Sequence, residues 1–246
     1  MENLQKKISL IIPTFLEEKM LGALLCKFTT ELKSKYKLEL IVSDGGSTDS
    51  TVAIAKQYAD IVVENTENEK QNISQGRNNG AKVATSDIFV FLNADCEPKD
   101  LEYFLEYIAN WKDSGVDAIA CSVRAFPTEE LLKDKIFYFI HNNYVQLLNT
   151  IGVGMGRGEC QIIRRSMFEK VCGYNSMLVA GEDFDLYRRI SKNKGKIHFA
   201  DDLVICESPR RYRKYGYLKT LWFWSINSLA VIFCNKSVSK EWEAIR

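Results

Sequence analysis

The stretch that decides the fold of this chain is Ile88-Phe89-Val90-Phe91-Leu92-Asn93-Ala94-Asp95-Cys96-Glu97-Pro98. Five apolar residues run without interruption and then meet polar ones, a pattern typical of a strand buried on both faces. In open α/β sheets, ligands bind outside the carboxyl ends of the strands, so Asp95 is expected where a ligand would lie, on the same side of the extended chain as Asn93. A carboxylate there suits a hard divalent cation that also touches substrate phosphates. The plainer alternative is an Asp that begins a turn, followed by Pro98.

The length, charge and cysteine content limit the class of protein. The 246 residues suffice for one large domain or two small ones, and 46% hydrophobic and 26% charged residues are ordinary for a globular protein. The formal net charge of +1 provides no global field for nucleic acid or another polyanion. Seven cysteines without a Cys-x-x-Cys pair predict reduced thiols in a cytosolic protein, and no signal peptide is expected before the first strand.

Residues 1–95 alternate between apolar runs and amphipathic segments. Strands are predicted at 7–13, 38–43, 61–64 and 88–93, and helices at 21–32, from Asp49 to 58, and at 73–85. This alternation with short connections predicts a parallel, doubly wound sheet. We interpret residues 1–95 as a nucleotide-binding half, with candidate ligand loops after Pro13 and after Ser43.

Residues 96–212 differ in character from the first half. Strands are predicted at 118–123, 160–164, 197–200 and 203–206, and helices at 101–111, 131–148, 166–171 and 184–190. The segment 152–158 holds four glycines, which let the backbone approach a ligand or leave a mobile loop. With no repeat and no long linker, we expect one compact domain with a carboxy-terminal appendage.

Asp44 stands at the end of a predicted strand, before Gly45 and Gly46. Its carboxylate could accept hydrogen bonds from a base or a ribose, and the two glycines allow the tight turn that such a site needs. Asp49 is better explained as a residue of the first helical turn that complements the helix dipole.

Five short motifs follow one another within residues 7–212. They are Pro13-Thr14-Phe15-Leu16-Glu17-Glu18, Val42-Ser43-Asp44-Gly45-Gly46-Ser47-Thr48-Asp49, Gly76-Arg77-Asn78-Asn79-Gly80, Asn93-Ala94-Asp95 and Gly181-Glu182-Asp183. In this order they resemble the successive signatures of family 2 glycosyltransferases with the GT-A fold. The resemblance implies a Rossmann-like, mostly parallel sheet flanked by helices. It also implies an inverting transfer of a sugar from a nucleotide-sugar to an acceptor hydroxyl.

The same resemblance implies a donor site and a general base. The donor site would comprise Pro13, Thr14, Glu17, Asp44, Arg77, Asn93, Ala94, Asp95, Arg210 and Arg211. Glu17, or Glu18 in its place, would lie near the base, which Asp44 would contact. Arg77 would contact the ribose or the phosphates, and Asp95 would bind Mg²⁺ or Mn²⁺. Asp183 would be the general base, with Glu182 the next candidate.

Three positions depart from the pattern of the family. Asn93 replaces the first Asp of the Asp-x-Asp motif, and Leu16 stands where the family often has Asn. No histidine occurs late in the chain where some members place a further metal ligand, and Glu207 is a candidate substitute. His141 and His198 are interpreted as structural residues, because neither is placed beside a Ser or Cys nucleophile.

The chemistry expected of the candidate residues agrees with the resemblance. A glycosyl donor carries a diphosphate that must be neutralised as it leaves, which a metal on one carboxylate and arginines can do. A positioned Asp can take the proton of the attacking hydroxyl. Without the resemblance, acidic residues in a first helical turn are ordinary. Two alternatives stay open: a nucleotidyltransferase, and a sugar-nucleotide-binding module without catalysis.

Residues 213–246 form the predicted carboxy-terminal segment, which is basic at first and then apolar. Arg210, Arg211, Arg213 and Lys214 precede the apolar run 218–234, which is shorter than a membrane span needs. This run, which contains Trp222, Phe223, Trp224, Ile226, Leu229 and Phe233, suits a helix lying in a bilayer interface. A helix packed on the domain or on a second subunit is the equal alternative. The first interpretation predicts a peripheral protein on the cytoplasmic face of the membrane, with a lipid-linked acceptor.

Overall fold

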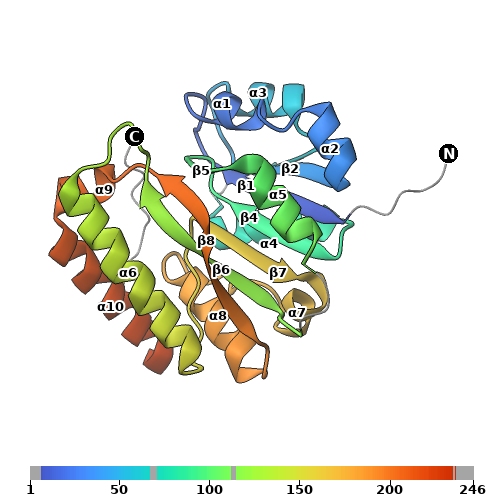
Figure 1. Cartoon of the computed structure of the whole chain (residues 1–246). Helices are drawn as coiled ribbons and strands as arrows, with labels where there is room; N and C mark the ends of the chain where they lie inside the picture. The colour runs from blue at the N-terminus through green and yellow to red at the C-terminus, as the bar shows by residue number, and fades with distance from the viewer. Residues whose placement is uncertain (1–6, 67–70, 112–114, 235, 237–246) are drawn as a thin grey trace.

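The amino-terminal strands form the parallel half of an eight-stranded sheet in the computed structural model, which describes residues 7–66, 71–111, 115–234 and 236 (Figure 1). These strands are β1 (Ile8–Thr14), β2 (Leu38–Asp44), β3 (Ile61–Glu64) and β4 (Ile88–Leu92), in the order β3-β2-β1-β4. Every residue of β4 is buried, as its unbroken apolar run predicts. The predicted parallel arrangement of the first half is confirmed.

The second half of the sheet is mixed. It contains β5 (Cys96–Pro98), β6 (Ala118–Ala125), β7 (Cys160–Arg164) and β8 (Ile197–Glu207), and the order continues β4-β7-β6-β8-β5. Strand β7 is antiparallel to both of its neighbours. The short strand β5 was not predicted. The two strands predicted at 197–200 and 203–206 are one strand, because a bulge between its two pairings with β6 keeps the chain in the sheet.

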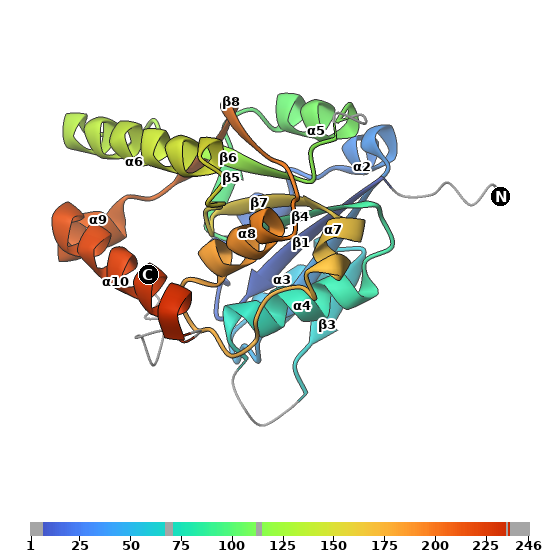
Figure 2. The same cartoon turned by 90° about the horizontal axis from the view of Figure 1, so that it is seen from below.

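Helices cover both faces of the sheet. They are α1 (Leu21–Leu25), α2 (Thr30–Tyr36), α3 (Thr51–Tyr58), α4 (Ile73–Val83), α5 (Leu101–Ala109), α6 (Leu132–Thr150), α7 (Arg165–Lys170), α8 (Glu182–Lys192), α9 (Arg210–Tyr215) and α10 (Tyr217–Cys234). Figure 2 shows α5 and α4 on opposite sides of the sheet. One apolar core lies between the sheet and α1, α2 and α5, and a second lies between the sheet and α4, α7 and α8.

Two helix predictions are wrong in detail. The helix expected at 21–32 is broken into α1 and α2, because the hydroxyl of Thr29 caps α2 by accepting from the N–H of Leu32. Asp49 does not lie in the first turn of α3 but before it, where its carboxylate accepts from the N–H of Thr51 at 3.0 Å. Both corrections reflect local hydrogen bonds that compete with a longer helix.

The carboxy-terminal helices are packed on the rest of the chain. Tyr217, Leu221 and Trp224 lie against the first core, and Val231 is buried near Leu178. The boundary predicted at residue 212 falls inside α9. Figure 1 shows α10 running beside α6 at one side of the molecule. No helix in the described part of the chain is long and apolar enough to cross a bilayer.

Candidate active site

The carboxyl ends of β1 and β2 are joined through Asp44. Thr14 lies opposite Asp44 in the sheet, and its hydroxyl donates to the Asp44 carboxylate at 3.2 Å. The carboxylate also accepts from the N–H groups of Gly46 and Ser47, at 2.9 and 2.7 Å, and from the Ser47 hydroxyl at 2.5 Å. Asp44 is buried and shapes the glycine turn that follows β2. Its contact with a nucleotide base stays a prediction.

The loop after β1 is held against the loop after β2. The N–H of Leu16 donates to the Ser47 hydroxyl at 2.7 Å, and the N–H of Glu17 donates to the Thr51 hydroxyl at 2.8 Å. Leu16 has a φ of 56°, in the left-handed region that asparagine tolerates better than leucine. This backbone conformation explains why an Asn would suit the position. Glu17 is half-buried and Glu18 exposed, and both remain candidates for a place near the base.

Arg77 joins three segments from inside the protein. Its guanidinium donates to the Glu182 carboxylate at 2.9 Å, to the Asn93 side-chain oxygen at 3.0 Å and to the Gly158 carbonyl at 2.6 Å. The side chain has no exposed surface. The predicted contact of Arg77 with ribose or phosphates stays a prediction. With its guanidinium buried in this network, Arg77 holds Glu182 and Asn93 in place.

Asn93 and Asp95 lie just beyond β4, as predicted, but in different surroundings. The Asn93 side-chain oxygen faces Arg77, and its main-chain N–H donates to the Glu159 carbonyl at 3.1 Å. Ala94 is buried, whereas Asp95 is half-exposed. One carboxylate oxygen of Asp95 forms an ion pair with Arg210 of α9 at 3.0 Å. Residues 115 positions apart in the sequence thus meet at the edge of the site.

Asp183 is the second residue of α8 and lies beside the Arg77 network. Its carboxylate accepts from the N–H of Phe184 at 2.8 Å. A Cβ atom added at Gly158 would lie 3.5 Å from Asp183 Oδ2 and 3.8 Å from an Arg77 nitrogen, so these groups converge on one glycine. Burial and the neighbouring charge of Glu182 raise the pKa of Asp183 to about 7. A carboxylate with such a pKa is well suited to accept a proton near neutral pH.

The comparison with known proteins agrees with this geometry. The profile of a family described as "Glycosyl transferase family 2" matches residues 9–172. The chain belongs to this family. It is a glycosyltransferase, as the sequence motifs predict.

Three relatives illustrate the breadth of the similarity. Glycosyltransferase AglE of Haloferax volcanii is 24% identical over 212 residues, which cover 83% of this chain and 68% of that protein. The dolichyl N-acetyl-alpha-D-glucosaminyl phosphate 3-beta-D-2,3-diacetamido-2,3-dideoxy-beta-D-glucuronosyltransferase of Methanococcus voltae is 33% identical over 220 residues, covering 80% of this chain and 65% of that protein. Among solved structures, a mannosyltransferase from Pyrobaculum calidifontis in complex with GDP-Man and Mn²⁺ has a TM-score of 0.66 at 18% identity, covering 88% of this chain and 63% of that one. The chain therefore spans about two thirds of the length of each protein.

A buried ionic cluster of the glycosyltransferase was not predicted. The guanidinium of Arg157 donates to Glu159 at 2.9 Å and to Glu207 at 3.1 Å, and the Tyr212 hydroxyl donates to Glu207 at 2.7 Å. Burial and the charge of Glu159 raise the pKa of Glu207 well above its usual range. Arg157 and Glu159 flank Gly158, at the end of the glycine-rich segment. This charged pair was the feature of the sequence from which the ionic cluster could have been predicted.

The glycines of this segment serve close packing and the site. A Cβ atom added at Gly154 would lie 2.4 Å from the Tyr187 carbonyl oxygen, and one at Gly156 would lie 2.4 Å from the Tyr187 ring. The segment therefore rests on α8 through two glycines, and Gly158 then reaches Arg77 and Asp183. Of the two roles predicted for these glycines, the structure shows close approach of the backbone. The group that the backbone approaches is Tyr187 and not a ligand.

Asp95 fits a metal site in which substrate phosphates supply some of the ligands. Among residues 7–66, 71–111 and 115–234, no three His, Cys, Asp or Glu side chains gather as a ready-made metal cage. Mg²⁺ commonly takes one or two protein carboxylates, substrate phosphates and water. A half-exposed Asp95 satisfies that requirement. Arg157 and Tyr212 both donate to Oε1 of Glu207, and the role of Glu207 as a further metal ligand stays a prediction.

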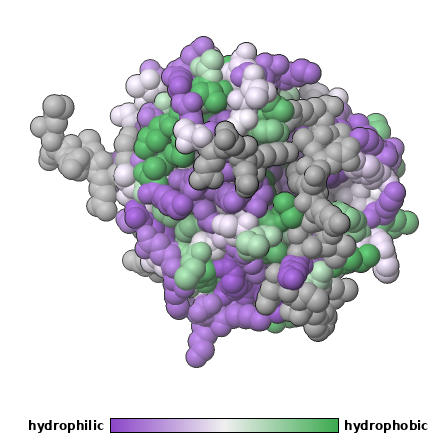
Figure 3. All heavy atoms as spheres, turned by 180° about the vertical axis from the view of Figure 1, so that it is seen from behind, coloured by the Kyte–Doolittle hydropathy of each residue, from purple (hydrophilic) through white to green (hydrophobic). Residues whose placement is uncertain are grey.

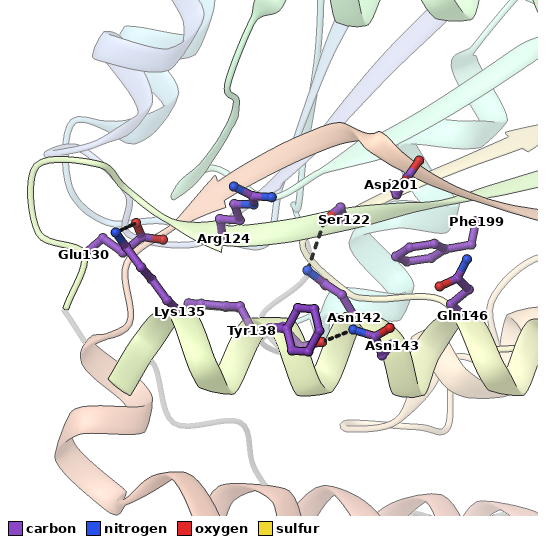
Figure 4. Close-up of a pocket in the computed structure, with 11 residues that line it drawn as sticks. Ser122, Arg124, Glu130, Lys135, Tyr138, Asn142, Asn143, Gln146, Phe199 and Asp201 are labelled. Atoms are coloured by element: carbon purple, nitrogen blue, oxygen red, sulfur yellow. Dashed lines mark hydrogen bonds and ion pairs between the residues drawn. The ribbon is translucent and has the colours of Figure 1, made fainter. Parts of the chain in front are cut away.

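A separate pocket of about 500 Å³ lies between α6 and the strands β6 and β8 (Figure 4). Ser122 and Arg124 of β6 face Asn142 and Gln146 of α6 across it. Asn142 donates to the Ser122 hydroxyl at 3.0 Å. None of the predicted site residues lines this pocket. It therefore lies outside the cluster that contains Asp95 and Asp183.

Proposed function

We propose that this glycosyltransferase moves a sugar from a nucleotide-sugar to an acceptor hydroxyl with inversion of configuration and with the help of a divalent cation. The observation that carries the proposal is Asp183. Its pKa of about 7 suits a general base. It lies against the Arg77 network that reaches Asn93, two residues before Asp95.

Donor recognition is assigned to the edge formed by β1, β2 and β4. The loops that carry Pro13, Thr14 and Glu17 and the turn at Asp44 would receive the nucleoside. Arg210 and Arg211 would bind the diphosphate, since guanidinium groups match phosphate oxygens in a bidentate way. In this scheme Arg210 exchanges its ion pair with Asp95 for a phosphate contact when the donor enters.

Asp95 is the residue that would hold Mg²⁺ or Mn²⁺. The cation, when bound, supplies positive charge for the leaving diphosphate. The Pyrobaculum calidifontis mannosyltransferase, which contains GDP-Man and Mn²⁺, supports this assignment through its similar fold. Asn93 is not assigned to the metal, because its side-chain oxygen accepts from Arg77.

Inversion follows from a single displacement. The acceptor oxygen forms a bond to the anomeric carbon from the face opposite the diphosphate. The bond between that carbon and the diphosphate oxygen breaks, and its electron pair leaves with the diphosphate. Asp183 takes the hydroxyl proton. Without a covalent sugar–enzyme intermediate, one displacement inverts the anomeric centre.

We also propose a lipid-linked acceptor at the cytoplasmic face of a membrane. The name of the Methanococcus voltae relative specifies a dolichyl-phosphate-linked sugar as its acceptor. In the present chain, the basic helix α9 reaches Asp95 through Arg210, so an anionic lipid headgroup would meet positive charge beside the site. A homodimer through the carboxy-terminal segment is the alternative use of that surface.

The test is donor binding followed by turnover. Saturation-transfer NMR against a panel of GDP- and UDP-sugars identifies the donor, and a donor-hydrolysis assay then reports chemistry. Asp183→Asn should lower turnover by about 100-fold or more, the scale of general-base catalysis, with little change in donor affinity. Asp87→Asn, on the surface, is the matched control.

Two results would contradict this scheme. Native turnover in Asp183→Asn would assign the base elsewhere, with Glu182 the next candidate. Binding of a nucleotide-sugar without hydrolysis or transfer by the native protein would identify a binding module instead of an enzyme of this mechanism.

A further inference from the structure

The outer side of α6 carries a stripe of large apolar side chains. Leu132 is 73% exposed, Ile136 53%, Ile140 57% and Leu147 56%. These residues are separated by four, four and seven positions, so they lie along one side of the helix. The opposite side, including Tyr138, is buried against the sheet. An apolar stripe on the outside of a helix whose inside is already packed needs its own explanation.

Helix α10 extends this apolar surface. Trp224 of α10 lies 5.3 Å from the ring of His141 on α6, so the two helices are in contact. On the outside of α10, Leu218 is 82% and Trp222 is 69% exposed.

Apolar exposure is concentrated on these two helices. Within the described part of the chain, eleven of sixteen exposed large hydrophobic side chains lie on α6, on α10 or next to α6, namely Leu131, Leu132, Ile136, Phe139, Ile140, Tyr144, Leu147, Ile151, Leu218, Trp222 and Phe223. Seen from behind, the molecule is mainly hydrophilic where it is coloured, with small separate hydrophobic patches (Figure 3). We call the surface formed by these eleven residues the α6–α10 face.

The charges around the α6–α10 face are positive. Asp134 is the only acidic residue in 131–158, and it is fully buried and paired with Arg213. No Asp or Glu occurs between 208 and 240. Lys133 and Lys219 are exposed near the amino-terminal ends of α6 and α10. Lys135 and Arg213 are also there, with Glu130 and Glu129 of the preceding loop as ion-pair partners.

We infer that the α6–α10 face docks on an anionic lipid bilayer. Apolar side chains enter the acyl boundary and the lysines meet the headgroups, as for helices that lie in a bilayer interface. A second copy of the chain fits less well, because it would bring lysines against lysines with no exposed carboxylate on either helix to pair with them. The basic end of this face is also the end from which Arg210 reaches Asp95.

This inference deepens the proposed membrane location and rests on it, but it assigns the contact to different residues. The sequence alone pointed to the aromatic residues of 218–234. In the structure Trp224 packs against His141 and Tyr212 and is partly buried. The larger share of the exposed apolar surface comes from α6.

The test uses vesicles of phosphatidylglycerol and phosphatidylcholine in equal parts, with pure phosphatidylcholine as the comparison. The native chain should co-sediment with the anionic vesicles at low salt and be partly released at high salt. Ile136→Ser with Ile140→Ser should lower the partition coefficient about tenfold or more. Val83→Ser with Met177→Ser, which removes exposed apolar side chains elsewhere, should leave it unchanged. Lys133→Gln with Lys219→Gln should lower binding to anionic vesicles only.

The outcomes separate this inference from the glycosyl-transfer proposal. A native chain that stays in the supernatant with anionic vesicles at low salt would overturn the inference. So would equal binding by Ile136→Ser with Ile140→Ser, provided circular dichroism finds that variant folded. A dimer in light scattering that these two substitutions dissociate, without vesicle binding, would assign the face to self-association. Vesicle binding by a chain that transfers no sugar would refute the proposed chemistry and leave the docking surface intact.

Discussion

The pH dependence of turnover is the most direct measure of the role of Asp183. Its pKa is raised to about 7, because the carboxyl is buried and lies beside Glu182. A base acts only when it is deprotonated, so kcat/KM should fall as the pH drops through this value. With a pKa of about 7, the ionised fraction is about one tenth at pH 6 and about nine tenths at pH 8. The native enzyme should therefore lose about tenfold in kcat/KM across this interval.

Glu182→Gln is the perturbation that tests the cause of the raised pKa. The amide oxygen of glutamine can still accept from Arg77, but the negative charge beside Asp183 is gone while the positive charge of Arg77 stays. The loss of this negative charge lowers the pKa of Asp183, by roughly one unit for a close charged neighbour. The kcat/KM at pH 6 should then rise to about half of its value at pH 8, a change worth about 1.4 kcal/mol in the free energy of Asp183 ionisation.

The assay is initial-rate donor hydrolysis or transfer at low donor concentration from pH 5.5 to 8.5, with Glu106→Gln as a surface control. The control should keep the native profile. A native profile that is flat between pH 6 and 8, or a Glu182→Gln profile that superimposes on the native one, would refute the reasoning about Asp183.

Three further predictions concern the metal, a buried histidine and a strained residue. Asp95→Ala should weaken nucleoside diphosphate binding in calorimetry and make it insensitive to EDTA, whereas EDTA should weaken binding to the native chain. Burial and the charge of Arg157 lower the pKa of His141 to about 3, so below about pH 6.5 the unfolded chain binds a proton that the folded chain does not. The unfolding free energy should then fall by up to about 1.4 kcal/mol for each unit by which the pH is lowered. His141→Phe should remove this contribution to the pH dependence of stability in denaturant melts. Leu16→Asn should raise the unfolding free energy by about 1 kcal/mol, since asparagine tolerates the left-handed conformation.

Each of these has its own contrary result. EDTA-insensitive binding to the native chain would remove the metal from Asp95. An acid dependence of stability that His141→Phe leaves unchanged would assign the titration to other groups. Leu132→Asn, in a regular helix, is the control for Leu16→Asn, and an equal or lower stability of Leu16→Asn than of native would contradict the strain argument.

The strands and the donor edge were predictable because their signals are local. The apolar run of β4 ends where Asn93 and Asp95 begin, and the run of β2 ends at Asp44 before two glycines. The ends of a buried parallel strand can be predicted from the sequence, because its apolar residues are consecutive and stop where the strand ends. The order of the motifs then placed Asp183 at the same site, although nothing local distinguishes it from other acidic residues at a helix start.

What stayed hidden depends on contacts between distant residues. Arg157 and Glu207 are 50 positions apart, and only the tertiary fold brings them together. The burial of Arg77 likewise needs partners from three segments. The left-handed Leu16 runs against the preference of its own side chain, so local propensity would not indicate it. The exposure of the apolar outer side of α6 could not be predicted, because the periodicity of a helix indicates an apolar side but not whether another element covers it.

The short strand β5 sets the shape of the sheet through the length of the chain that leads to it. Strands β4 and β5 stand four places apart in the sheet order, which in a flat sheet would be about 19 Å at about 4.8 Å per strand. The four steps from Leu92 to Cys96 can span at most about 14 Å. This connection is too short for a flat sheet. The sheet must therefore bend so that β8 comes close enough to β4 for Cys96 to pair with Glu207. Asp95 lies on this connection, so the distance between Asp95 and Arg210 of α9 depends on the number of residues in it. One or two residues added between Leu92 and Cys96 would let the sheet flatten and would move α9 away from Asp95.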